Sequence, residues 1–379
     1  MADATDRLRL ARAEGVGPVA YRRLIARYGS ARAALEALPR LASAGGRTSP
    51  PTVPTVNEAE RELHDIERRG ARALFFGEPA YPPLLALLDD APAEITVLGD
   101  LSALTDRSVA LVGGRNASAN GQRVAETLAA DLAHSLVIVS GLARGIDAAA
   151  HAGALRSGRT VAAVAGGLDV PYPPEHADLQ RRVAEAGAVV TEAPLGATPQ
   201  ARHFPRRNRI IAGLALGVIV VEAALRSGSL ITARLAQDAG RELFAVPGSP
   251  LDPRSRGAND LIRQGAHLTE TAQDVLDNLP DHPAREGLAR DPLFARGNPG
   301  LSEAVRDWQE PPEGPPDLAR ARMQVLELLG NSPTAVDDIV RRCQFSAAAV
   351  AAVLLELELA GRVETLPGGR VALLSETAF

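Results

Sequence analysis

The feature that most constrains the fold is a regular alternation of short apolar runs with helical segments, which begins at Ser108. Nearly every residue in these runs is apolar, as expected of strands that are covered on both faces of a sheet. The intervening segments of about 10–15 residues have the length of crossover helices. The alternation predicts an α/β fold with a doubly wound (Rossmann-like), mostly parallel sheet. The predicted strands are Val109–Val112, Leu136–Val139, Val161–Val164, Val189–Thr191, Val218–Val221, Leu243–Val246 and Ala266–Leu268.

The chain before this sheet has a helical character. Residues 5–38 carry apolar side chains at helical spacing, and the Gly15-Val-Gly17-Pro18 break is similar to the turn of a helix-hairpin-helix. The prolines of residues 39–57 predict a linker or a loose loop. A helix near residues 57–70 and a strand at 94–98 follow. The pattern predicts a small N-terminal helical domain.

The chain after the sheet changes character twice. Residues 280–317 are rich in proline, glycine and charge, which predicts a flexible linker. Three helical stretches and a hairpin around Pro367-Gly368-Gly369 follow, in the order of a winged helix. Residues 346–360, at the position of the recognition helix, have no basic side chain, so we expect packing or protein contact there rather than DNA reading. The predicted domains are 1–80 (N-terminal helical), 81–279 (Rossmann-like), 280–317 (linker) and 318–379 (winged helix).

Composition excludes several classes of chemistry. The chain has no lysine, so all 41 basic residues are arginine, which excludes a P-loop and Schiff-base catalysis. The single cysteine, Cys343, excludes an intrachain disulfide and a cysteine-based zinc site. A net charge of −5 excludes a uniformly basic nucleic-acid binder but not a local basic patch. Without a long apolar stretch or a signal-peptide pattern, we expect a cytoplasmic protein with no membrane span.

Glycine, serine and arginine are concentrated directly after the predicted strands, where open α/β sheets bind ligands. Glycine lets backbone N–H groups approach a ligand, hydroxyls donate hydrogen bonds, and helix N-termini attract anions. A single loop of this kind is explained equally well by turn geometry. Five or six at one edge favour a polyanion over a mononucleotide. These loops begin at Gly113, Ser140, Gly166, Arg202, Arg226 and Pro247.

The most basic segment is the predicted loop at residues 202–209, which carries four arginines and Phe204. Either these arginines contact phosphate groups, or they pair with acidic neighbours on a solvated loop. Phe204 either stacks a base, as in single-strand binders, or plugs the loop into the core. Because aromatic residues make up only 3% of the chain, we expect contacts with the phosphate backbone to dominate any nucleic-acid affinity.

Competing chemistries have weaker support. The first loop is not G-x-G-x-x-G, and Ser140 stands where a dinucleotide binder places an acid, so NAD binding is not expected. No histidine has metal-ligand spacing, and His151 is expected to cap or pack a helix. Four acids near strand ends either form a catalytic set or, as we favour, cap helices and hold arginines such as Arg115 and Arg144. These acids are Asp147, Asp169, Glu192 and Glu222. We expect no enzyme activity, cofactor or metal.

A series of motifs resembles the DNA-processing protein A (DprA/Smf) family of bacteria. The resemblance covers roughly residues 80–275 with the motifs in order, and the flanking helical and winged-helix segments fit the family's layout. The motifs are Ala110-Leu-Val-Gly-Gly-Arg-Asn-Ala-Ser118, Val139-Ser-Gly-Leu-Ala-Arg-Gly-Ile-Asp147, Gly166-Gly-Leu-Asp-Val-Pro-Tyr-Pro173, Phe204-Pro-Arg-Arg-Asn-Arg209, Val221-Glu-Ala, Ser227-Gly-Ser-Leu-Ile-Thr232 and Val246-Pro-Gly248.

The resemblance implies a single-stranded DNA binder that protects incoming DNA in natural transformation and helps to load the RecA recombinase. It also implies a homodimer formed through the α/β domain. Two departures weaken single contacts: Gly114 stands where the family has Ser or Thr, and Ala258 where Cys or Ser is common. The DNA-binding residues implied by the motifs are Arg115, Ser140, Gly141, Arg144, Gly145, Gly166, Arg206, Arg207, Asn208, Arg209, Ser227, Gly228, Ser229 and Asn259.

Three functions remain open on the sequence. The leading one is a sequence-independent, non-enzymatic single-strand binder whose affinity falls with salt. For this function we expect that replacing Arg115 by alanine, or changing Arg206 and Arg207 together, weakens binding with little loss of stability. The alternative is a nucleotide-hydrolysing, phosphoribohydrolase-like Rossmann enzyme, although the Pro-Gly-Gly-x-Gly-Thr signature of those enzymes is absent from the sheet loops. A transcription regulator acting through the winged helix is disfavoured by the missing basic residues at 346–360.

Overall fold

The structure is a computed structural model, and it describes residues 2–281, 316–330, 332–366 and 369–374. The described residues form two compact units. One runs from residue 64 to residue 281, and the other combines residues 2–63 with the described residues from 316 onward. The predicted linker, residues 280–317, lies mostly outside the described residues, as does most of the predicted turn at residues 367–369.

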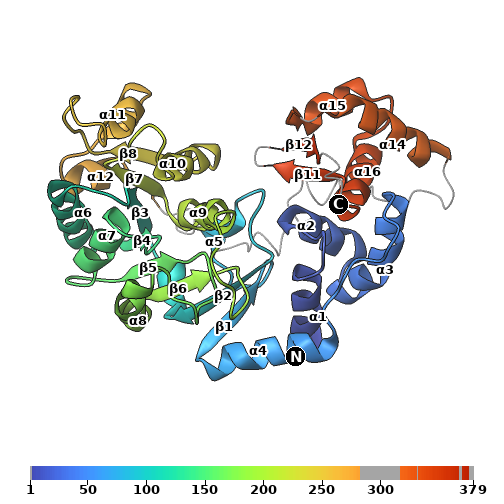
Figure 1. Ribbon diagram of the computed structural model, residues 1–379, viewed down its shortest axis with the longest axis horizontal. Coiled ribbons are helices and arrows are strands. Elements are labelled where there is room, and N and C mark those ends of the chain that lie inside the picture. Colours follow the sequence, from blue (N-terminus) through green and yellow to red (C-terminus); the bar gives the residue numbers. More distant parts are fainter. Residues whose placement is uncertain (1, 282–315, 331, 367–368, 375–379) are drawn as a thin grey trace. The chain divides into compact units, whose positions relative to one another are not determined.

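A nine-stranded sheet forms the centre of the larger unit (Figure 1). Its strands lie in the order β1-β2-β6-β5-β4-β3-β7-β8-β9. All neighbours from β6 to β9 are parallel, whereas β2 runs antiparallel to both β1 and β6. The predicted fold class, a doubly wound and mostly parallel sheet, is confirmed. The strands are β1 (Ala71–Phe75), β2 (Glu94–Gly99), β3 (Ser108–Gly113), β4 (Val137–Ser140), β5 (Thr160–Ala163), β6 (Ala188–Thr191), β7 (Gly217–Val221), β8 (Glu242–Ala245) and β9 (His267–Leu268).

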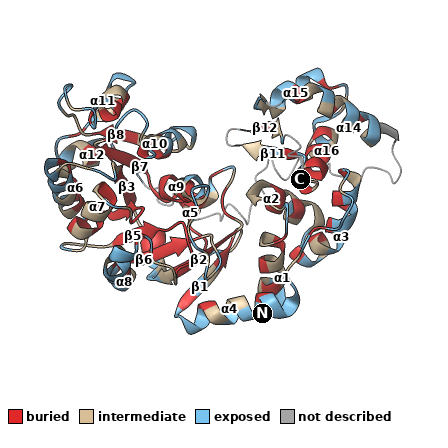
Figure 2. Ribbon diagram, in the orientation of Figure 1, coloured by how far each residue is buried: buried red, intermediate tan, exposed pale blue. Residues whose placement is uncertain are grey.

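Helices cover both faces of this sheet, and its central strands are buried (Figure 2). One apolar cluster joins α6, α7 and α12 to the face that presents Ile138, and another joins α9, α10 and α11 to the face that presents Val139. This two-sided burial is why the strands read as continuous apolar runs. The helices are α5 (Pro83–Ala86), α6 (Ala119–Leu132), α7 (Ile146–Ala154), α8 (Ala177–Ala186), α9 (His203–Leu214), α10 (Ser229–Asp238), α11 (Arg256–Arg263) and α12 (Ala272–Asn278), with short 3₁₀ turns at Leu101–Leu104 and Pro174–His176.

The order of the strands reverses at β3. Strands β4, β5 and β6 follow on one side of β3, and β7, β8 and β9 on the other. Because these strands are parallel, the loops that leave them meet at one edge of the sheet, and the crevice of a doubly wound fold opens at the reversal. The glycine- and arginine-rich segments therefore gather at the carboxyl edge, as the sequence predicted.

The smaller unit contains the predicted N-terminal helices and the winged helix. Strands β10 to β12 form a three-stranded sheet in the order β10-β12-β11. Helix α16 is buried along most of its length and packs against α14 and α3, which agrees with the expectation that it packs rather than reads DNA. Among the described residues, no helix is both long and apolar enough to cross a membrane. The elements are α1 (Ala2–Ala11), α2 (Pro18–Tyr28), α3 (Ala31–Ala44), α4 (Val56–Arg68), α14 (Pro316–Leu328), β10 (Thr334–Ala335), α15 (Val336–Arg342), α16 (Ala347–Leu359), β11 (Val363–Leu366) and β12 (Arg370–Leu373).

The prediction that a linker begins at residue 39 was wrong, because α3 continues through Pro39 to Ala44. An interior proline removes one helix hydrogen bond and costs about 3 kcal/mol. Leu38 and Leu41, on either side of it, are buried. Burying a leucine contributes about 1.5–3 kcal/mol, so the packing of this face offsets the proline.

Candidate nucleic-acid interface

A cavity of about 420 Å³ opens at the carboxyl edge of the sheet. Its walls come from the loops after β3, β4 and β5 and from the start of α9. Five of the predicted binding residues line it: Arg115, Gly141, Arg144, Gly166 and Arg207. The cavity therefore joins residues that are far apart in the sequence.

A stack of cationic and aromatic groups forms one wall of the cavity. The Cζ atom of Arg115 lies 4.7 Å from the centre of the Phe204 ring, and that of Arg207 lies 5.9 Å from it. The ring of Tyr172 contacts the same phenylalanine, with 5.7 Å between ring centres. Phe204 is thus neither a free base-stacking platform nor a core plug. It is half-buried and holds the exposed Arg115 by a cation–π contact.

Arg207 forms the floor of the cavity rather than an exposed phosphate contact. Its guanidinium Nη1 lies 3.7 Å from Asp147 Oδ2, and the two side chains are only 6% and 8% exposed. A Cβ atom at Gly141 would lie 1.3 Å from Arg207 Nη1, so glycine is needed there to admit the guanidinium. Burial raises the pKa of Asp147, and the neighbouring Arg207 counteracts this rise.

Arg209 is also buried against acidic side chains. Its guanidinium forms an ion pair with Glu192 and lies 3.7 Å from Asp90 Oδ2. The prediction that residues 202–209 form a loop was wrong, because α9 begins at His203. Pro205 is tolerated in the first turn, where the backbone N–H has no helical partner. Helical geometry turns Arg207 and Arg209 inward and leaves Arg206 exposed.

Two predicted glycines shape the loops around the cavity. Gly145 has a φ of +77°, and a Cβ atom there would lie 2.3 Å from the carbonyl oxygen of Gly114. It therefore lets the start of α7 press against the Arg115 loop. A Cβ atom at Gly166 would lie 2.8 Å from the carbonyl oxygen of Ala197. Both positions maintain close backbone packing beside the cavity.

The other predicted residues differ in how free they are to meet a ligand. Ser140 is fully buried and donates a hydrogen bond to the carbonyl oxygen of Leu111 at 2.6 Å. Arg144 is exposed and paired with Glu175 at 2.5 Å. Arg206 is exposed in the first turn of α9, and Arg202, which was not among the predicted binding residues, is exposed directly before that helix.

A second group of predicted residues lies away from the cavity lining, in α9, in α11 and in the segment where α10 begins. Asn208 Nδ2 approaches the carbonyl oxygen of Gly228 at 3.5 Å, and the hydroxyls of Ser227 and Ser229 share a hydrogen bond of 2.6 Å. Asn259 is bound to the backbone N–H and carbonyl of Gly248 at 3.0 and 2.8 Å. These side chains hold neighbouring backbone segments together, and their contact with a ligand remains a prediction.

The acidic residues at the strand ends make structural contacts, as we favoured. Asp169 accepts a hydrogen bond from the Gly196 backbone N–H at 2.8 Å, and Glu222 accepts one from the Ser118 N–H at 2.8 Å. We expected these acids to hold Arg115 and Arg144. Instead, Asp147 is paired with Arg207, and Glu192 is paired with Arg209. Within the described ranges, no cluster of acids, histidines and cysteine is suited to a metal ion.

His151 packs inside α7, in agreement with the prediction. It is fully buried, and its Nδ1 atom lies 2.7 Å from the hydroxyl of Thr160. Burial, the largest influence, lowers the pKa of His151 to about 3, and the positive charge of Arg207 acts in the same direction. The imidazole is therefore neutral in the folded protein at neutral pH.

We expect this buried imidazole to make the fold acid-sensitive. In the unfolded chain His151 takes up a proton below its ordinary pKa of 6.5, whereas in the folded chain it resists protonation down to about 3. Stability is therefore lost as the pH falls through this window, by about 1.5 kcal/mol between pH 6.5 and pH 5 from this group. Urea unfolding of wild type and H151Q at both pH values measures this loss, which H151Q should lack. The exposed His134, changed in H134Q, is the control, and an equal pH dependence in all three proteins contradicts the assignment.

Sequence reasoning missed several residues that build the cavity. Asn116 and Tyr172 line it, and Glu175 pairs with Arg144. Tyr172 and Glu175 lie in a Tyr-Pro-Pro-Glu segment after the third predicted strand, whose prolines fix an ordered turn. This Tyr-Pro-Pro-Glu segment was the feature of the sequence from which Tyr172 and Glu175 could have been predicted.

The fold and the cavity together define the class. This is a doubly wound α/β protein with an arginine-lined cavity at the carboxyl edge of its sheet, and Ser140 stands where a dinucleotide site has an acidic residue. Three family models match the sequence: "DNA recombination-mediator protein A" at residues 72–280, "DprA winged helix domain" at 309–369 and "DprA-like N-terminal HHH domain" at 1–64. The chain belongs to the DNA recombination-mediator protein A (DprA/Smf) family.

Individual relatives agree with this assignment. Protein Smf of Escherichia coli K12 is 42% identical over 296 residues, which cover 77% of this chain and 75% of that protein. The X-ray structure of DNA processing protein A from Streptococcus pneumoniae superposes with a TM-score of 0.57 at 42% identity, over 60% of this chain and 80% of that one. DNA processing protein A from Helicobacter pylori, whose structure concerns its single-stranded DNA binding mode, has a TM-score of 0.51 at 31% identity, over 55% of this chain and 95% of that one.

Proposed function

We propose that this chain binds single-stranded DNA without sequence preference, through the arginine-lined cavity at the carboxyl edge of its sheet. The observation that carries the proposal is the exposed guanidinium of Arg115, held over Phe204 at the mouth of this cavity. Among the described residues, no carboxylate lies within ion-pair distance of Arg115, so its charge is available to a phosphate group. The single-stranded DNA binding mode described for the Helicobacter pylori relative supports the same function.

The geometry favours a single strand over a duplex. Single-strand sites combine a basic groove with aromatic side chains, because the backbone and the unpaired bases are both accessible. Here the exposed Arg115, Arg144 and Arg206 supply the charge, and Tyr172, which is 46% exposed, supplies an aromatic surface beside the cavity. The proposed binding residues remain the predicted set, with direct phosphate contact assigned to the exposed arginines and a supporting role to Ser140, Gly141, Arg207 and Arg209.

Oligonucleotide binding across a salt series tests this function. Three exposed arginines, Arg115, Arg202 and Arg206, are available to neutralise phosphates, whereas Arg144 is paired with Glu175, so log K against log salt should have a slope of about −2 for single strands. We expect single-stranded oligonucleotides of different sequence to bind equally and more tightly than the matching duplexes. Equal affinity for single strands and duplexes, or an affinity that salt does not change, contradicts the proposal.

We propose that the chain acts without catalysing a reaction. The acids at the strand ends are engaged with Arg207, Arg209, Ser118 and the Gly196 backbone, which supports a structural use for them. Incubation with nucleoside monophosphates and assay for released base distinguishes this proposal from the phosphoribohydrolase-like alternative, for which base release is expected.

Protection of single-stranded DNA and loading of the RecA recombinase are further proposals, placed in the cytoplasm, where recombination takes place. The family description as a recombination mediator supports them. Nuclease digestion of bound oligonucleotides tests protection. Recombinase filament formation on coated DNA, with and without this protein, tests loading.

We also propose a homodimer formed through the α/β domain. Strand β9 lies at the edge of the sheet, and its half-exposed Leu268 offers an apolar contact for a second copy of the chain. Sedimentation analysis of the full chain tests the assembly.

The three-domain layout remains a proposal. Because β1 pairs with β2, the Rossmann-like domain is proposed to begin before residue 71 rather than at residue 81.

A further inference from the structure

Glu222 has an unusual backbone conformation directly after β7. Its φ is +45°, in the left-handed region that residues with a Cβ atom disfavour. Such a conformation is unfavourable, and it persists only where the surrounding contacts over-determine it. Glu222 follows the strand next to β3, at the point where the strand order reverses.

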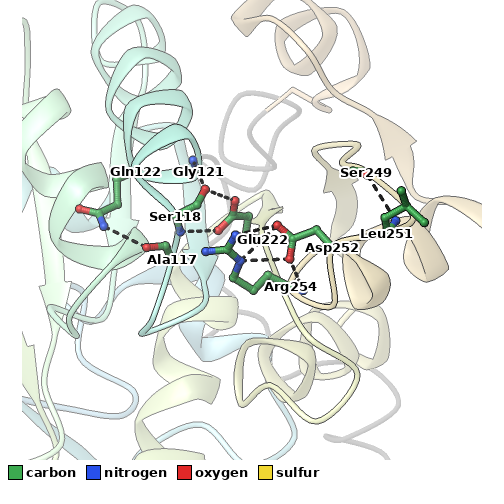
Figure 3. Close-up of polar contacts among 9 residues, drawn as sticks. All are labelled: Ala117, Ser118, Gly121, Gln122, Glu222, Ser249, Leu251, Asp252 and Arg254. Carbon is green, nitrogen blue, oxygen red and sulfur yellow. Dashed lines mark hydrogen bonds and ion pairs between the residues drawn. The ribbon is translucent and has the colours of Figure 1, made fainter.

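The contacts of Glu222 hold both ends of the loop that carries Arg115. At the first end, the Gly114 N–H donates to the carbonyl oxygen of Glu222 at 2.7 Å. At the second end, the Ser118 N–H donates to Glu222 Oε2 at 2.8 Å, and the Ser118 hydroxyl donates to Oε1 (Figure 3). The backbone carbonyl and the carboxylate of Glu222 therefore hold the two ends of residues 114–118.

The carboxylate also fits the beginning of α6 closely. Ser118 caps this helix by accepting a hydrogen bond from the Gly121 N–H at 2.9 Å. A Cβ atom at Gly121 would lie 2.5 Å from the carboxyl carbon of Glu222, so the carboxylate is pressed against the first turn. A helix N-terminus favours a negative charge, which stabilises the carboxylate in this position.

The opposite side of the Arg115 loop is closed by α7. The Ile146 N–H donates to the carbonyl oxygen of Gly114 at 3.3 Å. A Cβ atom at Gly145 would lie 2.8 Å from the carbonyl oxygen of Arg115, so the two backbones are in close contact. The backbone of the loop is thus held between Glu222 and α7. The Arg115 side chain extends from it, exposed, over Phe204.

The charge of Glu222 has the opposite sign to that of the binding edge. Arg254 lies beside Glu222 (Figure 3), but its guanidinium is hydrogen bonded to both oxygens of Asp252, at 3.0 and 3.2 Å from Nε. Asp252 first, and Glu222 to a smaller extent, raise the pKa of Arg254. If Glu222 acted on DNA only through its charge, removing that charge would strengthen the binding of a polyanion.

We propose that Glu222 is a positioning residue, which holds the 114–118 loop so that Arg115 is aimed at DNA phosphates from over Phe204. This inference rests on the proposed single-strand binding function. By this inference Glu222 strengthens DNA binding, although its negative charge alone would weaken it.

The test compares E222A and E222Q in oligonucleotide binding by the full chain. Glutamine keeps an acceptor for the Ser118 N–H and a polar partner for its hydroxyl, so E222Q should bind within about threefold of wild type. Alanine releases the loop, and E222A should bind about tenfold more weakly, because the loop must then be ordered when DNA binds. Tighter binding by both variants overturns the inference, because it is the result expected from charge alone.

A double-mutant cycle with R115A separates positioning from general structural damage. If Glu222 acts through Arg115, E222A should weaken binding by R115A no further. An undiminished loss in the R115A background overturns the inference while leaving the proposed function intact. If R115A alone binds normally, the proposed site fails and the inference with it.

S118A provides a second variant in case E222A does not fold. It removes the hydroxyl that donates to Glu222 and caps α6, and it leaves the carboxylate and the backbone contact of Ser118 in place. We expect weaker binding that is again not additive with R115A. Full affinity in S118A, with E222A unfolded, overturns the inference.

Discussion

Replacement of Arg207 by alanine should lower the free energy of unfolding by about 3–5 kcal/mol, because it leaves the carboxylate of Asp147 buried without its counter-charge. The pair is almost completely buried, at 6% and 8% exposure, so water does not compensate for the lost guanidinium. The space that Gly141 provides would also be left unfilled. Denaturant unfolding of R207A measures the loss. The expectation from sequence that Arg207 can be replaced with little loss of stability is contradicted by this burial.

The neighbouring residue supplies the matched control. Arg206 has the same chemistry one position earlier but is exposed on α9, so R206A should change stability by no more than about 0.5 kcal/mol. D147A combined with R207A removes both charges, and its loss should be smaller than the sum of the two single losses. Additive losses, or an R207A protein as stable as R206A, would show that the pair is not coupled.

The fold was predictable where burial is two-sided. Strands β3 to β8 lie between two layers of helices, so they read as continuous apolar runs with turns at their ends. Strand β1 was not predicted, because it lies at the edge of the sheet and exposes Arg72, which interrupts the apolar pattern. The continuation of α3 through Pro39 depends on burial of its neighbours against other helices, and a local pattern does not contain that contact.

The site was predictable in composition but not in the direction of its side chains. The gathering of Arg115, Gly141, Arg144 and Gly166 follows from their positions after parallel strands. The fate of the arginines after Phe204 depended on whether the segment is a loop or a helix. In a helix successive side chains point about 100° apart, so adjacent arginines face different surroundings. Reading residues 202–209 as a loop therefore hid the burial of two of its four arginines.

Replacement of Arg115 by alanine should weaken single-stranded DNA binding by about 10- to 100-fold, the range for a lost charge-assisted hydrogen bond to phosphate. The slope of log K against log salt should become shallower by about 0.7, because one phosphate contact is lost. The side chain is exposed, so the free energy of unfolding should change by no more than about 0.5 kcal/mol. Titration of a labelled oligonucleotide at several salt concentrations measures both effects.

Lysine at the same position separates charge from geometry. R115K keeps the positive charge, so the salt slope should stay at the wild-type value. Lysine lacks the planar guanidinium, whose Cζ atom lies 4.7 Å from the centre of the Phe204 ring. A guanidinium can form two hydrogen bonds to one phosphate, so the affinity of R115K should fall between those of wild type and R115A. R263A removes an exposed arginine at the end of α11, away from the carboxyl edge, and controls for the net charge of the protein. If R263A and R115A lose affinity equally, binding depends on overall charge and the cavity is not its site. A loss confined to R115A, with an intermediate R115K, assigns the phosphate contact to the oriented guanidinium over Phe204.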